Sequence, residues 1–282
     1  MNERHERLGR LLADAATRLG PGPPWLVLGT VPLDRPPAGP GPAAGSGLAE
    51  ESSLAGGEEL RRWVRRHVDA WPAPIGIAAE PPELHPGRIV FTPPRHPGRP
   101  AGTYSCELRA DGSALGAVQV GTLRESPSDG GEVWAIGEGA LAWLTIALLR
   151  LLTSYATYAT YSTGQETRSG GAVVEATVIP ATGDGRVVPM EVWNHDGGAY
   201  GRAGVRRLAA AGTARRPVDL AACSSPALTA TARPLVLDLL RRFGLSESRH
   251  IDPAGVLRRG HFTGHDELIH TWADAIGIPS EP

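Results

Sequence analysis

One stretch constrains the fold more than any other, the apolar run from Gly139 to Gly164. Large apolar residues recur in it at alternating steps of three and four positions, which is the spacing of one face of an α-helix. They are Leu141, Leu144, Leu148, Leu151, Tyr155 and Tyr158. Arg150 is the only charged residue between the two glycines, so little of this helix is suited to water. We therefore predict a central packing helix over 139–164.

The opposite face of this helix carries Trp143, Arg150 and Tyr161. Packing at the edge of the core would explain these residues. Aromatic residues and arginine are also enriched where proteins meet, so a protein partner or a second copy of the chain is the other interpretation. The sequence leaves both open.

A membrane location is not expected. A transmembrane helix needs ~20 mostly apolar residues. The only candidate is interrupted by Arg150 and continues into a segment rich in Thr, Tyr and Ser. The first 20 residues mix acids with arginines and lack the apolar centre of a signal peptide. Together these features predict a cytoplasmic protein without a membrane partner.

Composition excludes several classes of enzyme. The 282 residues contain no lysine, so all 28 basic residues counted as Lys or Arg are arginine. Sites that depend on a Walker A lysine, a Schiff-base lysine or the protein-kinase lysine are therefore ruled out. The chain also lacks a GxSxG elbow, and no GxGxxG motif follows a predicted strand. We predict no cofactor.

Two pairs of strands indicate an α+β fold, in which antiparallel hairpins pack on the central helix. Residues 103–108 pair with 115–122 across an Asp-Gly turn, and 172–179 pair with 187–193 across a loop with two glycines. We also expect helices over 4–19, 58–71, 204–211, 235–243 and 266–276, and strands over 25–31, 75–77, 88–91 and 132–136.

The chain is expected to divide near residue 200. Residues 1–200 form the predicted α+β domain, in which 34–57 is a flexible loop because it is built from Pro, Gly, Ala and Ser with few large apolar residues. Helical patterns dominate from there to the end, so 201–282 is predicted to be a helical subdomain. Pro234 is expected to kink a helix in this subdomain or to begin another.

Two groups of residues could support chemistry. Glu175 and Glu191 fall on the two strands of the second predicted hairpin, where facing carboxylates could act in acid–base catalysis or bind a metal. Outward-facing polar residues explain them equally well. The densest set of possible metal ligands is His250, His261, His265 and His270, with Asp252, Asp266 and Glu267. His265 and His270 are five apart and point away from each other on a helix, so this set also fits ordinary surface histidines.

Arginine is the most informative residue type. Residues 201–260 contain 11 arginines and 4 acids, which gives 11 − 4 = +7. A basic face of that kind can bind phosphates. Solvated helix faces in a lysine-free chain are the alternative. The predicted nucleic-acid contacts are the paired arginines Arg206, Arg207, Arg215, Arg216, Arg241, Arg242, Arg258 and Arg259.

Four stretches also carry a family resemblance. They are WLVLGTVPL at 25–33, CELRADGS at 106–113, ALAWLTIALLRLL at 140–152 and VPMEVW at 188–193. Together they resemble the region that follows the AlbA-type (Schlafen-like) domain in DNA-binding proteins of GC-rich bacteria. The resemblance implies association with DNA. No AlbA-type domain is evident ahead of it, so no functional residue is carried over.

These observations favour a non-catalytic binding or regulatory protein, associated with nucleic acid through its arginine-rich C-terminal region. The first alternative is an enzyme that uses the 250–270 histidine cluster or the Glu175/Glu191 pair. The second is a structural protein that binds a partner through Trp143, Arg150 and Tyr161.

Overall fold

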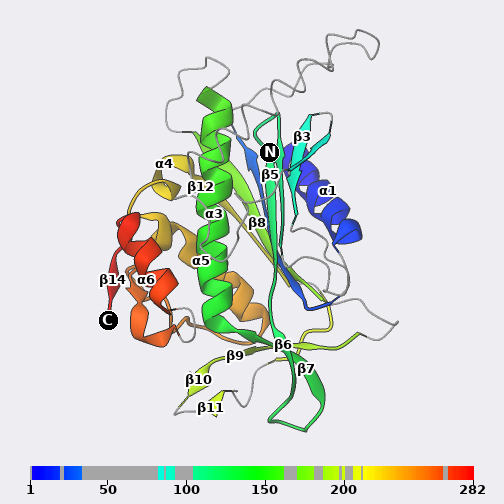
Figure 1. Ribbon diagram of the computed structural model, residues 1–282, viewed down its shortest axis with the longest axis vertical. Helices are drawn as coiled ribbons and strands as arrows, with labels where there is room; N and C mark the ends of the chain where they lie inside the picture. Colours follow the sequence, from blue (N-terminus) through cyan, green and yellow to red (C-terminus); the bar gives the residue numbers. More distant parts are fainter. Residues whose placement is uncertain are drawn as a thin grey trace.

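The computed structural model describes residues 2–19, 22–33, 82–85, 87–92, 104–161, 170–180, 187–196, 199–200, 206–210, 212–262 and 266–282. It shows a mixed α+β architecture built on one seven-stranded sheet (Figure 1). Every neighbouring pair of strands is antiparallel, and their order across the sheet is Gly212–Asp219, Gly171–Ile179, Trp25–Pro32, Ala114–Gln119, Tyr104–Arg109, Arg88–Phe91 and Glu83–His85. The predicted loop 34–57, the helix 58–71 and the strand 75–77 lie outside the described residues.

The elements of the large sheet come from both halves of the chain. They are β1 (Trp25–Pro32), β2 (Glu83–His85), β3 (Arg88–Phe91), β4 (Tyr104–Arg109), β5 (Ala114–Gln119), β8 (Gly171–Ile179) and β12 (Gly212–Asp219). The β4–β5 pair is the first predicted hairpin, and Gly112 in its turn has φ +79°, a backbone conformation that glycine adopts without strain. That hairpin is confirmed.

Smaller sheets lie beside the large one. β6 (Thr122–Glu125), β7 (Glu132–Gly137) and β9 (Met190–Trp193) form a three-stranded sheet. Two-stranded pairs are made by β10 (His195–Asp196) with β11 (Ala199–Tyr200), and by β13 (Leu257–Arg258) with β14 (Ser280–Glu281). The second predicted hairpin is wrong, because β8 pairs with β1 and β12 whereas β9 runs parallel to β7.

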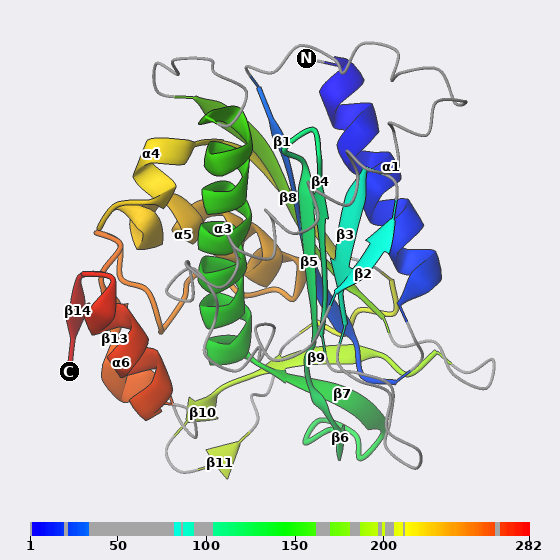
Figure 2. The same ribbon diagram turned by 45° about the horizontal axis from the view of Figure 1, so that its top comes forward.

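Helices cover both faces of the large sheet. The described helices are α1 (Asn2–Arg18), α3 (Glu138–Tyr161), α4 (Leu220–Cys223), α5 (Leu228–Arg242) and α6 (Asp266–Ala275), with a 3₁₀ turn η3 (Arg259–His261). Figures 1 and 2 show α1 on one side of the sheet and α3, α4 and α5 on the other. Strand β1 serves both faces, since Leu26 and Leu28 join the α3 cluster while Trp25 and Val27 join the α1 cluster.

The central helix is confirmed as α3. Its leucines at 141, 148, 149, 151 and 152 are each at most 1 % exposed, and they belong to the largest hydrophobic cluster. Among the described helices, α3 alone is long and apolar enough to cross a bilayer, and 78 % of that segment is buried within the protein. The helix is therefore enclosed by the sheet on one side and by other helices on the other.

The C-terminal third departs from the prediction in two places. Residues 212–219 form strand β12 instead of part of a helical subdomain, and the described part of the predicted helix 204–211 is not helical. The helical prediction holds for α5, which runs unbroken through Pro234 and ends before Gly244, where φ is +83°. The boundary at residue 200 stays a prediction, and α5 and α6 share one hydrophobic cluster with the sheet.

Candidate functional site

The eight arginines predicted to contact nucleic acid divide into two groups in the structure. Four of them are matched by carboxylates. Arg207 lies between two acids, donating from Nε to Glu191 at 2.6 Å and from its terminal nitrogens to Asp129 at 2.5 and 2.6 Å. The Arg207 hydrogen bonds lower the pKa of Asp129 to about 2. The positive charge of Arg207 is therefore already neutralised inside the molecule.

Three further arginines are matched in the same way. Arg215 donates from Nε to Glu175 at 2.6 Å, across the β12–β8 pair in which the two residues lie opposite each other. Arg258 pairs with Glu281 at 3.2 Å, between β13 and β14. Arg259 pairs with Asp274 of α6 and donates to the hydroxyl of Ser280 at 2.7 Å. The contacts of Arg258 and Arg259 hold the C-terminal segment in place.

Of the other four arginines, two share one acid. Arg216 of β12 donates to Asp238 of α5 at 2.8 Å, and Arg241 donates to the same carboxylate at 2.9 Å. No ion pair is found for Arg206 or Arg242 among the described residues, and both are exposed. We name Arg206, Arg216, Arg241 and Arg242 the α5 arginine cluster. With Asp238 it carries 4 − 1 = +3 charges.

Backbone geometry brings this cluster together from three segments. The amide of Arg206 donates to the carbonyl of Phe243 at 2.9 Å, directly after the end of α5. Gly212, the first residue of β12, is so close to Arg242 that an added Cβ would lie 3.3 Å from the Cβ of Arg242. The negative C-terminal end of a helix dipole favours Arg241 and Arg242 at this place. It does not account for Arg206 and Arg216, which come from outside the helix.

The predicted carboxylate pair does not form. Glu175 lies on β8 in the large sheet and Glu191 lies on β9 in the three-stranded sheet, so the expectation that they face each other across one hairpin is wrong. Each is held by an arginine. Glu191 also accepts hydrogen bonds from Ser126 at 2.9 Å and from the indole of Trp193 at 2.8 Å. Both carboxylates act here as structural anchors.

The histidines of the C-terminal region do not share one environment, although the rings of His250 and His261 lie 6.2 Å apart. His250 is 2 % exposed, whereas His261 is exposed and His265 lies outside the described residues. Asp252 accepts a hydrogen bond from the amide of Val256 at 2.8 Å and so stabilises its own turn. Within the described part of the chain, no three His, Cys, Asp or Glu side chains converge as a metal site would require.

His250 instead belongs to a buried network around Glu138, the first residue of α3. One oxygen of Glu138 accepts from the amide of Arg249 at 2.7 Å and from the hydroxyl of Ser248 at 3.1 Å, and it lies 3.3 Å from Nδ1 of His250. The other oxygen accepts from Asn194 at 3.1 Å. Glu138 is 1 % exposed, so this network ties the start of α3 to the C-terminal segment.

The face of α3 that was predicted to bind a partner is partly buried against another helix of the same chain. Trp143 is 3 % exposed and stands edge-on to Trp272 of α6, with ring centroids 4.6 Å apart. Helix α6 therefore occupies the place that the sequence left open at this residue. Arg150 is half-buried, and the side chain of Tyr161 lies outside the described residues.

The sequence predicted the arginines of the α5 arginine cluster but not Asp238, the acid that Arg216 and Arg241 share. Asp238 and Arg241 are three apart on α5, a spacing that places them on one face, and this signal was available. The contact between Arg216 and Asp238 spans 22 residues and could not be read from spacing.

Comparison of the chain with family models, with curated proteins and with solved structures gives no match. The resemblance to the region that follows an AlbA-type domain therefore stays a prediction.

Proposed function

We propose that this chain is a non-catalytic binding protein that associates with nucleic acid through the α5 arginine cluster. The observation that carries the proposal is the imbalance of four exposed arginines against the single carboxylate of Asp238. Arginine presents up to five N–H donors in a planar fork that fits phosphate oxygens. Phosphate contacts of this kind supply affinity and position without reading sequence.

The matched arginines support the same assignment by contrast. Arg207, Arg215, Arg258 and Arg259 each have a carboxylate partner, so a phosphate would have to displace an existing ion pair. In the α5 arginine cluster, Arg216 and Arg241 share one carboxylate, and Arg206 and Arg242 have no ion pair among the described residues, so these two need no such exchange. The eight predicted contacts thereby reduce to four.

Salt-dependent binding tests this proposal. Fluorescence anisotropy would follow a labelled DNA duplex titrated with the full chain at several salt concentrations. Replacing Arg206 and Arg242 with Gln should weaken binding at low salt. It should also reduce the slope of log K against log salt by up to about 2, because each lost phosphate contact removes roughly 0.9.

A charge-matched control is available in the same chain. Arg10 of α1 and Arg124 of β6 are exposed and lie outside the α5 arginine cluster. Replacing both with Gln changes the net charge by the same amount, and this variant should bind DNA as the wild type does. Equal losses in the two variants, or no binding by the wild type at low salt, would refute the proposal. A labelled single-stranded RNA in the same assay identifies the preferred nucleic acid.

A further inference from the structure

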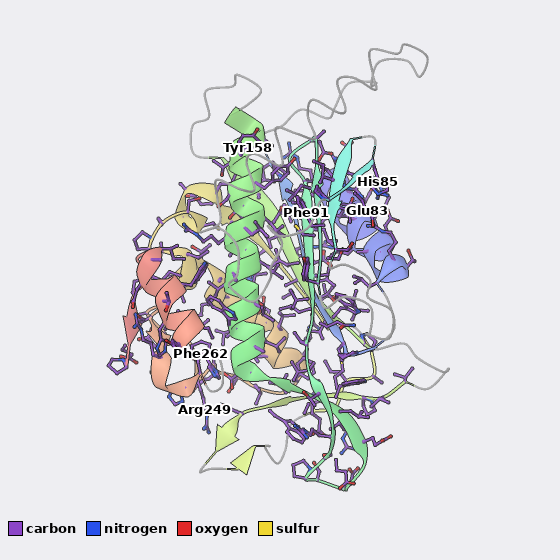
Figure 3. All side chains as sticks on the ribbon, in the orientation of Figure 1. Glu83, His85, Phe91, Tyr158, Arg249 and Phe262 are labelled. Atoms are coloured by element: carbon purple, nitrogen blue, oxygen red, sulfur yellow. The ribbon has the colours of Figure 1, made fainter. Side chains whose placement is uncertain are left out.

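A polar cleft lies at the opposite edge of the large sheet, where β2, β3 and β4 meet. Its volume is about 370 Å³, and it is lined by His85, Gly87, Arg88 and Arg109. A neighbouring cleft of about 320 Å³ continues from Arg109 towards α1. Figure 3 labels Glu83 and His85 on β2, on the side of the molecule where α1 lies.

Strand register brings the basic lining residues into one row. Arg88 of β3 lies directly opposite Arg109 of β4, and His85 of β2 lies directly opposite Arg88. Side chains at directly opposite positions of antiparallel strands project from the same face and lie close together. Like charges placed in this way are unfavourable. The row therefore needs negative charge from another source.

Glu107 supplies only part of that charge. It is 1 % exposed and has three arginine partners, Arg109 at 2.6 Å, Arg18 of α1 at 2.7 Å and Arg88 at 3.6 Å. The sum over these four side chains is 3 − 1 = +2. Burial favours the neutral form of Glu107, but hydrogen bonds from Arg18 and Arg109 outweigh it and lower its pKa. The acid is therefore ionised, and this one carboxylate is shared by three arginines.

Other acids lie near the cleft. Glu3 and Asp14 line the neighbouring cleft beside Arg7 and Arg10. Asp111 is paired with Arg7 of α1, and Glu83 is exposed and lies 3.5 Å from His85. Among the described residues, Glu107 is the carboxylate that contacts Arg88 and Arg109.

We infer that Arg88 and Arg109 form a binding site for a phosphate dianion, either free or as a phosphomonoester. Arg88 and Arg109 both line the cleft, and their guanidinium groups supply N–H donors suited to the oxygens of that ligand. Glu107 holds Arg109 and Arg18 in place before the ligand arrives, which reduces the entropy lost on binding. Arg88, the most loosely held of the three, is free to turn towards the ligand.

Thermal unfolding of the full chain with added inorganic phosphate tests this inference. Phosphate should raise the Tm of the wild type in a saturable manner, as any ligand of the folded state does. Arg88→Gln should lose this rise, with affinity weakened roughly tenfold or more. Without phosphate, its Tm should be no lower than that of the wild type, because the like-charged neighbour of Arg109 is removed.

Two control variants and a second ligand complete this experiment. Arg124→Gln removes an exposed arginine far along the chain and should keep the full phosphate effect. Phenyl phosphate that binds about tenfold more tightly than inorganic phosphate assigns a phosphomonoester, and equal affinities assign the free ion.

Three results would overturn the site: no saturable rise in the Tm of the wild type, the same rise in Arg88→Gln, or an equal rise with acetate. The Arg206/Arg242 variant should keep phosphate binding, so this test stands apart from that of nucleic-acid binding.

Discussion

At the scale of single residues, Glu138 shows how one buried charge joins distant parts of the chain. Its partners include Ser248 and His250, which follow it by 110 and 112 residues. Nε2 of His250 lies 3.0 Å from the carbonyl oxygen of His261. Both ring nitrogens of His250 thus lie beside oxygen atoms, one of Glu138 and one of the His261 backbone.

Acid should weaken this link. Burial favours neutral Glu138, but hydrogen bonding and the charge of His250 outweigh it, so the pKa of Glu138 is lowered in the folded state. A lowered pKa gives stability that is complete above the unfolded-state value of about 4.3 and is lost as the pH falls through the folded-state value. Glu138→Gln should therefore cost roughly 1.5–3 kcal/mol at neutral pH and progressively less in acid.

Urea unfolding of wild type and Glu138→Gln between neutral and acidic pH measures this difference. The gap in unfolding free energy should shrink on acidification. A gap that is constant or grows in acid would contradict the role given to Glu138. Glu247→Gln removes an exposed carboxylate of the same segment and should leave the unfolding free energy nearly unchanged at every pH.

At the scale of elements, the contact between α3 and β5 depends on a glycine. Gly116 of β5 is packed so closely under Leu148 that an added Cβ would lie 2.6 Å from Cδ2 of the leucine. Leu148 is 1 % exposed and belongs to the main hydrophobic cluster. The close approach of helix and sheet at this point requires the absence of a side chain on the strand.

A double-mutant cycle tests that contact. Leu148→Ala should cost about 2–5 kcal/mol as a core truncation, and Gly116→Ala should cost about 1–3 kcal/mol as an overpacked substitution. The double variant should be more stable than the sum of the two losses by roughly 0.5–3 kcal/mol, because the new methyl group enters the space that the leucine vacates. Chemical denaturation of the four proteins gives these values, and strict additivity would argue against the contact.

The same scale explains which elements could be predicted. Helix α3 was found because its pattern is local and repeats over six turns. Strand β12 was missed because its sequence GTARRPVD contains two exposed arginines and Pro217. Proline and charge are tolerated at the edge of a sheet, where one side of the strand has no partner. Edge position follows from the whole fold, and no window of the sequence reveals it.

Charge pairing was equally hidden. Arg206 and Arg207 are adjacent in sequence, yet among the described residues only Arg207 pairs with carboxylates, one of which, Asp129, is 78 residues away. The basic row at His85, Arg88 and Arg109 exists only through the register of three strands. The composition could indicate that arginine is the main basic residue of this chain. Which arginines have a carboxylate partner depends on the folded structure.

At the scale of the whole molecule, both sides of the predicted boundary at residue 200 build one core. The α5 residues Leu235, Val236, Leu239 and Leu240 are fully buried and join the cluster that contains α3. A fragment of residues 1–200 would expose that side of α3 and leave β8 without its partner β12. We expect the fragment to lose cooperative thermal unfolding and to bind hydrophobic dyes, whereas the full chain should not. Cooperative unfolding of the fragment would instead support an independent domain.

The strand order has a further physical consequence. The α5 arginine cluster adjoins β12 and the phosphate cleft adjoins β2, so the two lie at opposite edges of seven strands. Six gaps of about 4.8 Å separate those edge strands by roughly 29 Å. Electrostatic potential in physiological salt decays over about 8 Å, several times less than this separation. Anions bound at the two proposed sites would therefore be screened from each other, so filling one site should not oppose binding at the other.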